Sequence, residues 1–126
     1  MNTREIGREG ENLAVAYLIE NKATILARNF CLRDAEIDII FEEPAGHNRY
    51  GIDKYIVFAE VKYRNSESHG RAYESVNSGK IKKICKAAKI FLYKFHYPES
   101  TPVRFDVISI EKGSINHIKN AFDFVN

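Results

Sequence analysis

The sequence predicts an α/β protein in which two helices flank a mixed central sheet. Two segments carry apolar residues at helical spacing, three short apolar runs lie between them, and a fourth run follows the second helix. Strands joined by turns pair antiparallel, whereas a strand reached through a crossover helix pairs in parallel, so the order α-β-β-β-α-β indicates a mixed sheet. The 126 residues contain no internal repeat and no Pro/Gly-rich linker, so we expect a single domain over residues 1–126.

The predicted helices cover residues 3–21 and 76–96. The second is the clearer, because an apolar residue recurs at i, i+3, i+4 and i+7 along one face. That face consists of Ile81, Ile84, Cys85, Ala88, Phe91, Leu92 and Phe95. We expect Pro98 and Pro102 to end this helix. In the first helix, Gly7 and Gly10 would allow a close approach to a neighbouring element.

The predicted strands cover residues 24–31, 36–42, 55–63 and 103–110, with a short strand possible after Gly113. Side chains alternate between the two faces of a strand. We therefore expect one face of the second strand to carry Glu36, Asp38 and Ile40, and the other to carry Ile37, Ile39 and Phe41. The segment between the second and third strands contains Pro44, Gly46 and Gly51 and reads as a long loop.

Asp38, Glu60 and Lys62 form the pattern that carries chemistry. If the second and third strands are neighbours, the two carboxylates lie side by side, and a divalent cation would relieve their repulsion. Mg²⁺ held there would polarise a phosphodiester oxygen, and Lys62 would orient water or offset charge. The alternative is a solvated surface pair, but the third strand is otherwise apolar, and charges in a central strand need partners or a function.

Two residues on the helices extend this pattern. Glu11 lies at the margin of the first helix's apolar stripe, either as a third carboxylate for the metal or as an ordinary surface glutamate. Lys80 lies near the start of the second helix, where a phosphate is favoured. Glu36, on the same strand as Asp38, is a supporting candidate.

Basic residues are concentrated in residues 62–94, which carry a net charge of +7, whereas the remaining residues carry −5. Lys82, Lys86 and Lys89 form a stripe on the second helix that suits contacts with a nucleic-acid backbone, a solvated face being the alternative. Arg64 and Arg71 border the polar loop before that helix and are further candidates for such contacts.

Two structural expectations complete the residue analysis. Arg104 and Asp106 share a face of the fourth predicted strand and should form an ion pair that braces the site. Cys85 falls on an apolar helical face and should be a buried free thiol. No stretch approaches the roughly 20 apolar residues of a membrane span, and the N-terminus lacks a signal-peptide core, so we expect a cytoplasmic protein.

The motifs resemble those of the YraN family along nearly the whole chain. The matching blocks are Gly10-Glu11-Asn12-Leu13-Ala14, Asn29-Phe30, Glu36-Ile37-Asp38, Phe58 to Arg64, Lys80, Arg104-Phe105-Asp106-Val107 and Ile118 to Phe122. This family is similar to the PD-(D/E)XK nucleases, particularly archaeal-type Holliday junction resolvases. The resemblance implies a restriction-endonuclease-like αβββαβ core, Mg²⁺ or Mn²⁺, and catalytic residues at Asp38, Glu60, Lys62 and Glu11. Asp34-Ala35 stands where the family has Gly-Gly, and the loop of residues 42–54 is longer.

Three functions follow as hypotheses. The first is a divalent-metal-dependent endonuclease acting on DNA, for which a branched substrate and a two-fold homodimer would suit each other. The second is a non-catalytic nucleic-acid-binding module on the same fold, and the third is a scaffold that binds protein through the 42–54 loop. The set of Asp38, Glu60 and Lys62 favours the first, because a pure binder gains nothing from clustered acids beside phosphate.

Overall fold

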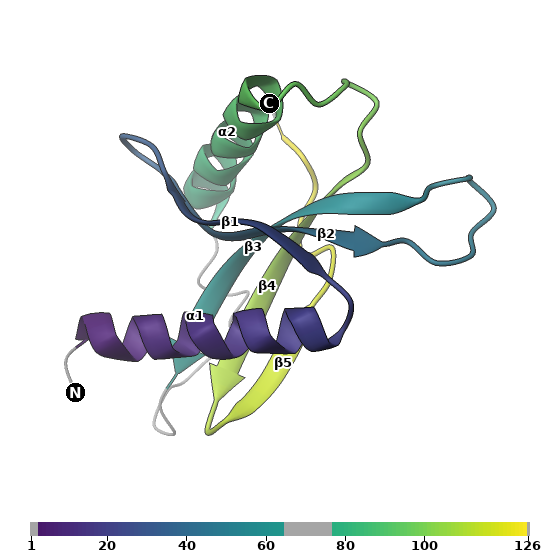
Figure 1. Ribbon diagram of the computed structural model, residues 1–126. Coiled ribbons are helices and arrows are strands. Elements are labelled where there is room, and N and C mark those ends of the chain that lie inside the picture. The colour runs from purple at the N-terminus through teal and green to yellow at the C-terminus, as the bar shows by residue number, and fades with distance from the viewer. Residues whose placement is uncertain (1–2, 65–76, 126) are drawn as a thin grey trace.

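The computed structural model describes residues 3–64 and 77–125 and arranges them as a mixed sheet with a helix on each face (Figure 1). The side chains of residues 3–6 and 64 lie outside that description. In chain order the elements are α1 (Thr3–Glu20), β1 (Thr24–Cys31), β2 (Glu36–Pro44), β3 (Lys54–Arg64), α2 (Ser78–Lys94), β4 (Val103–Glu111) and β5 (Ser114–Ile118). The predicted order is confirmed, and the short strand expected after Gly113 is β5.

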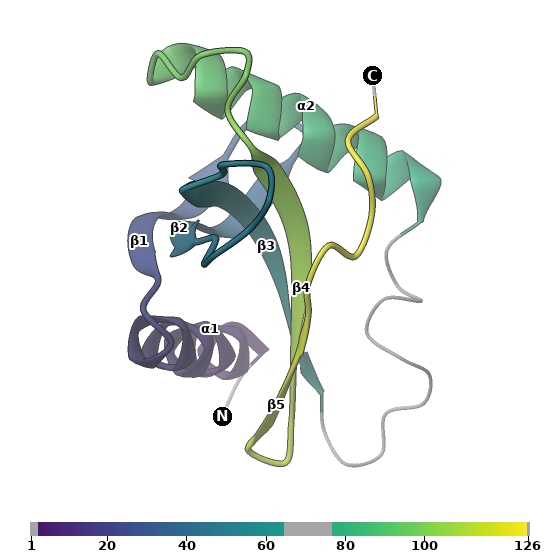
Figure 2. The same ribbon diagram turned by 90° about the vertical axis from the view of Figure 1, so that its right-hand side faces the viewer.

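The five strands lie in the order β1-β2-β3-β4-β5. β1, β2 and β3 form an antiparallel meander, β3 and β4 are parallel, and β5 returns antiparallel to β4. The parallel pair arises because α2 carries the chain back across the sheet between β3 and β4, as predicted. α1 and α2 cover opposite faces of the sheet (Figure 2).

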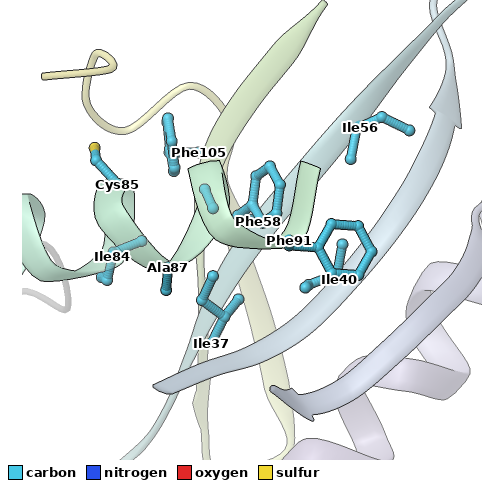
Figure 3. Packing of buried hydrophobic residues seen from close by; sticks show 10 residues of the cluster. Ile37, Ile40, Ile56, Phe58, Ile84, Cys85, Ala87, Phe91 and Phe105 are labelled. Carbon is cyan, nitrogen blue, oxygen red and sulfur yellow. The ribbon is translucent and has the colours of Figure 1, made fainter. Parts of the chain in front are cut away.

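Each helix packs on its own apolar cluster. The buried residues beneath α1 include Leu18, Ile39, Phe41, Val57 and Ile108. The α2 cluster is richer in aromatic side chains, and Figure 3 shows α2 laid across the sheet residues Ile37, Ile40, Ile56, Phe58 and Phe105. Apolar burial on both faces explains why the central strands β2 and β3 are almost continuously hydrophobic.

The predicted alternation along β2 is wrong at one residue. Ile37 belongs to the α2 cluster together with Ile40, although strict alternation would place it with Ile39 beneath α1. The cause lies in β1, where Asn29 has a left-handed φ of 52° and faces Asp38 between the pairs Arg28–Ile39 and Phe30–Ile37. A left-handed residue interrupts the regular alternation of a strand, so the side-chain pattern shifts by one at Asp38.

α2 is shorter than the predicted helix at both ends. It begins at Ser78 because Asn77 caps it, and the Oδ1 atom of Asn77 accepts the backbone N–H of Lys80 at 2.9 Å. It ends at Lys94 because His96 adopts a left-handed conformation, with φ 61°, two residues before Pro98.

Candidate active site

Asp38 lies where β2 separates from β3. The antiparallel ladder between these strands ends at the pair Ile39–Ala59. Beyond it, the Oδ2 atom of Asp38 accepts the backbone N–H of Val61 at 2.8 Å. A side-chain carboxylate therefore takes the place of a strand partner, which fixes Asp38 in the gap between the two strands.

The surroundings of Asp38 disfavour its charge. Burial is the largest influence, and the carboxylates of Glu60, Glu36 and Glu11 add to it, while the Val61 N–H opposes them. The pKa of Asp38 is raised to about 6. Carboxylates from α1, β2 and β3 thus act on one another at this point of the sheet, as the sequence predicted.

Glu60 binds two lysines through a single oxygen. Its Oε1 atom accepts from Lys62 Nζ at 2.8 Å and also from Lys80 Nζ. Its Oε2 atom is buried and has no hydrogen-bond partner among the described residues. A buried carboxylate oxygen without a partner is costly, which marks Oε2 as a place where a ligand would be bound.

The pKa values of the two lysines are shifted in opposite directions. Burial lowers the pKa of Lys62, and the nearby charge of Lys80 lowers it further, despite Glu60. For Lys80, burial acts in the same direction, but Glu60 outweighs it and raises the pKa. Of the two lysines, Lys62 is therefore the one that gives up a proton more readily.

A hollow of about 500 Å³ opens between these groups and the N-terminus of α2. Its walls include Asp38 and Glu60 on the sheet, and Asn77, Lys80 and Lys83 at the helix. The first turn of α2 contains no acidic residue. The positive end of the helix dipole therefore faces the hollow without a carboxylate of its own, an arrangement that favours phosphate.

Glu11 is held beside this site by the close packing of α1. A Cβ atom added to Gly10 would lie 2.5 Å from Tyr63 Cδ2 on β3, so the expected close approach is confirmed there, whereas Gly7 has nothing within 4 Å. Glu11 Oε1 accepts from Arg28 Nε at 3.0 Å and from Asn29 Nδ2 at 2.9 Å. The Glu11 carboxylate is thus bound to β1, and it influences Asp38 from there.

The remaining predicted site residues lie further out. Glu36 is exposed at the start of β2 and lines the hollow. The lysines of the predicted stripe, Lys82, Lys86 and Lys89, are all exposed on α2. Arg71 and the side chain of Arg64 lie outside the described residues.

The predicted ion pair between Arg104 and Asp106 is confirmed, with N–O distances of 2.9 and 2.8 Å. Arg104 also donates to Glu43 at 2.5 Å. Both residues lie on the α1 face of the sheet, since their strand neighbours in β3, Val57 and Ala59, belong to the α1 cluster. Glu60 faces α2, so this pair braces the sheet from the side opposite to Glu60.

His117 and Tyr17 complete that second network, although sequence reasoning assigned His117 no role. His117 Nε2 lies 2.6 Å from Asp106 Oδ2, and its Nδ1 atom lies 2.9 Å from the Tyr17 hydroxyl. Since an ionised carboxylate only accepts, Nε2 of His117 donates to Asp106, and Nδ1 is paired with the Tyr17 hydroxyl. Burial acts to raise the pKa of Asp106, but hydrogen bonds from Arg104, His117 and Asn120 outweigh it and hold the pKa below its usual value.

Sequence reasoning missed several residues around Asp38. Arg28 gave no signal beyond an ordinary strand, and Asn29 stood out only through its block of resemblance to the YraN family; their contact with Glu11 is seen in three dimensions alone. Asn77 carried a weak signal, since Asn directly before a helical pattern is a common N-cap. Lys83 was adjacent to the lysines of the stripe, but its side of the helix faces the hollow.

Comparison with known proteins gives the chain a family. The model described as "Uncharacterised protein family UPF0102" matches residues 10–110. The chain belongs to the UPF0102 family, which is the YraN family. It is similar to a UPF0102 protein of Lachnoclostridium phytofermentans, with 42% identity over 98% of this chain and 97% of the relative. A UPF0102 protein of Persephonella marina is 43% identical over 93% of this chain and 92% of the relative. A UPF0102 protein of Clostridioides difficile is 42% identical over 97% of this chain and 100% of the relative.

The donor set of this UPF0102 protein fits a cation that needs few protein ligands. No group of three or more His, Cys, Asp or Glu side chains within residues 3–64 and 77–125 has the arrangement of a metal site. Two carboxylates remain, Asp38 with its raised pKa and Glu60 with its unpartnered Oε2 atom. Mg²⁺ typically takes one or two carboxylates and completes its shell with water and phosphate, so this pair suits Mg²⁺ or Mn²⁺ better than zinc.

The described helices include none that is long and apolar enough to cross a membrane. α1 and α2 are both amphipathic, and each uses its apolar face to cover the sheet.

Proposed function

We propose that this UPF0102 protein is a divalent-metal-dependent endonuclease that hydrolyses phosphodiester bonds in DNA, branched DNA included. The observation that carries the proposal is the state of Glu60, which has one oxygen shared by Lys62 and Lys80 and the other buried without a partner. Asp38 lies beside it with a raised pKa. A carboxylate with one unpartnered oxygen and a second carboxylate with a raised pKa, beside two lysines and a helix N-terminus, suit a site completed by a cation and a phosphate.

The proposal includes a restriction-endonuclease-like core. The order α1-β1-β2-β3-α2-β4 supports it, as do the antiparallel meander and the parallel β3–β4 pair. The acidic residues lie at the end of the meander, where β2 and β3 separate, and the basic residues are supplied by the helix that follows β3.

Each residue has a defined task in this proposal. Asp38 and Glu60 would hold Mg²⁺ or Mn²⁺, which when bound activates a water and polarises the phosphodiester. Lys62 orients the attacking water, and its lowered pKa suits it to accept a proton. Lys80 releases Glu60 and binds the phosphate at the α2 N-terminus. Glu11 contacts the cation through a water molecule, while its own carboxylate stays bound to β1.

Sequence-independent contacts would come from the basic residues around α2. Lys82, Lys86 and Lys89 are exposed along the helix and suit contacts with the DNA backbone beyond the cleaved bond. Arg64 and Arg71 precede the helix in the sequence and belong to the same proposed surface.

The test is cleavage of labelled linear duplex, single-stranded, flap and four-way-junction DNA in Mg²⁺, Mn²⁺ or EDTA. Asp38→Asn and Lys62→Ala should each lose about 100-fold or more in rate, because each removes a group that acts on developing charge. Asp53→Asn is the matched control, since Asp53 is exposed in the β2–β3 loop. It should cut like the wild type.

The outcomes separate the candidate functions. Metal-dependent cutting that is lost in both site variants and kept in Asp53→Asn supports the proposal, and the preferred DNA structure names the substrate. A wild type that binds DNA in a salt-sensitive way but cuts none of the substrates would refute the nuclease and support the non-catalytic binding module. A preference for four-way junctions would direct attention to a homodimer, measurable by light scattering.

A further inference from the structure

A second hollow lies on the other side of Asp38, against α1 and β1. Its volume is about 1000 Å³, and its walls combine Arg8, Glu11 and Asn12 of α1 with Arg28 and Asn29 of β1. Asp38 and Glu36 line both this hollow and the one at α2. Asp38 is therefore not at the bottom of a single pocket but at the junction of two hollows.

Arg28 is built into the wall of this second hollow. Its Nε atom donates to Glu11 at 3.0 Å, and its Nη2 atom donates to Asn12 Oδ1 at 2.6 Å. A guanidinium has five N–H donors, so these two bonds leave donors for a further acceptor. The side chain is 37% exposed, which keeps those donors accessible from solvent.

The backbone of β1 is distorted at this position. Asn29 has a φ of 52°, a conformation that non-glycine residues seldom adopt within a strand. As a result Phe30 packs in the α2 cluster, while its near neighbour Arg28 contacts α1 on the opposite face. The distortion thus brings a cation to the wall of the hollow, next to Asp38, without exposing the phenyl ring.

The α1 and β1 walls of this hollow suit a phosphate chain. Within the part of the chain that the structure describes, the Arg8 side chain makes no hydrogen bond or ion pair, and it is exposed. On these two walls Arg8 and Arg28 exceed the charge of Glu11 by one, whereas the carboxylates of Glu36 and Asp38 lie where this hollow meets the one at α2. Asn12 and Asn29 add amide groups, and arginine is well suited to binding phosphate oxygens in pairs.

We propose that a single nucleic-acid strand crosses the site from one hollow to the other. Lys80 and Lys83 hold its phosphates on the α2 side, and Arg8 and Arg28 hold them on the α1 side. The bond presented to Asp38 then lies inside the chain rather than at its end. This inference rests on the proposed function, and it adds the path of the substrate and two binding residues.

The first test measures binding without cleavage. A fluorescent oligothymidine would be titrated in EDTA over a range of salt concentrations. The slope of log K against log salt is negative, and each lost phosphate contact decreases its magnitude by about 0.7 for a single strand. Arg28→Ala and Arg8→Ala should each show this decrease, whereas Arg28→Lys, which keeps the charge, should retain the wild-type slope.

The control is Arg49→Ala. Arg49 is exposed in the β2–β3 loop, where it donates to the Tyr50 hydroxyl at 2.8 Å, and it lines neither hollow. Its slope should equal that of the wild type, and an equal decrease in Arg49→Ala would overturn the inference in favour of general surface charge. Arg8→Ala also tests the inference in a variant that is expected to fold normally, because the substitution breaks no side-chain contact of the described structure.

The second test asks whether the cleaved bond lies inside a chain. Closed circular single-stranded DNA has no ends, so linearisation by the wild type is expected and failure to cut it while linear strands are cut would overturn the inference. If the wild type cuts but both arginine variants keep the wild-type slope, the proposed path along α1 is refuted and the proposed nuclease activity stands. A wild type that neither binds nor cuts would remove both proposals.

Discussion

Gly10 and Gly7 on α1 should respond in opposite directions to the same substitution. Alanine in a helix interior is favoured over glycine by about 0.8–1 kcal/mol. At Gly7 nothing lies within 4 Å of the added Cβ, so Gly7→Ala should stabilise the protein by most of that amount. At Gly10 the same methyl would lie 2.5 Å from Tyr63 Cδ2 and 2.9 Å from Tyr63 Cβ.

The contact with the Cβ atom of Tyr63 decides the sign at Gly10. Rotation about the side-chain bonds would move the ring away, but it leaves Cβ in place, so α1 itself must shift. Overpacking of this kind costs about 1–3 kcal/mol, which exceeds the gain in helix propensity. Gly10→Ala should therefore lose up to about 2 kcal/mol, or up to about 10 °C in melting temperature for a chain of this size.

The assay is thermal unfolding followed by circular dichroism, with both variants compared with the wild type. A shift of α1 would also move Glu11 relative to Arg28, so Gly10→Ala should weaken any DNA binding that depends on Arg28, and Gly7→Ala should not. If Gly10→Ala raised the melting temperature as much as Gly7→Ala, the close packing of α1 on Tyr63 would be refuted.

Three further predictions concern ionisable groups. Asp106→Asn should cost about 1.5–3 kcal/mol in urea unfolding, because it removes the charged acceptor of Arg104 and His117 while Glu43 stays paired with Arg104; Glu111→Gln, exposed at the end of the same strand, is the control and should change little. Asp38 has a folded-state pKa raised to about 6, so the stability that its neutral form confers is lost as the pH rises from about 4 through 6. In EDTA, Asp38→Asn should consequently melt above the wild type at pH 7.5 and converge with it towards pH 4, and equal melting at both pH values would contradict this reasoning. A thiol reagent should label exposed Cys31 in the folded protein and reach buried Cys85 only after unfolding, as mass spectrometry would show.

The sequence was sufficient for the architecture because local patterns determine it. Helical spacing over residues 81–95 and alternating apolar runs fixed the elements to within two residues at most boundaries, and the crossover helix implied the parallel pair. The same strand pattern led to the selection of Asp38, Glu60 and Lys62 as candidate site residues. The thiol of Cys85 was correctly placed in the core for the same reason.

What the sequence could not show depends on contacts between distant residues. The left-handed turn of Asn29 inside β1 shifted Ile37 to the other face, and no local signal distinguishes it from an ordinary strand residue. The Tyr17–His117 contact joins residues 100 positions apart. Lys80 was expected to meet phosphate, and only the three-dimensional arrangement shows that its own partner is Glu60.

Two aspartates of the same sheet illustrate why the site at Asp38 points to a ligand. Asp106 is buried among donors that hold its pKa below the usual value, so the fold is able to satisfy an interior carboxylate fully. Asp38 instead faces three other carboxylates, and burial together with them outweighs the backbone N–H of Val61 and the nearby Lys80. Folding alone would favour neutralising Asp38, and a side chain kept at such a cost is characteristic of a site completed by something outside the chain. The repulsion at Asp38 is thus the part of the structure that folding does not explain and that a bound cation would relieve.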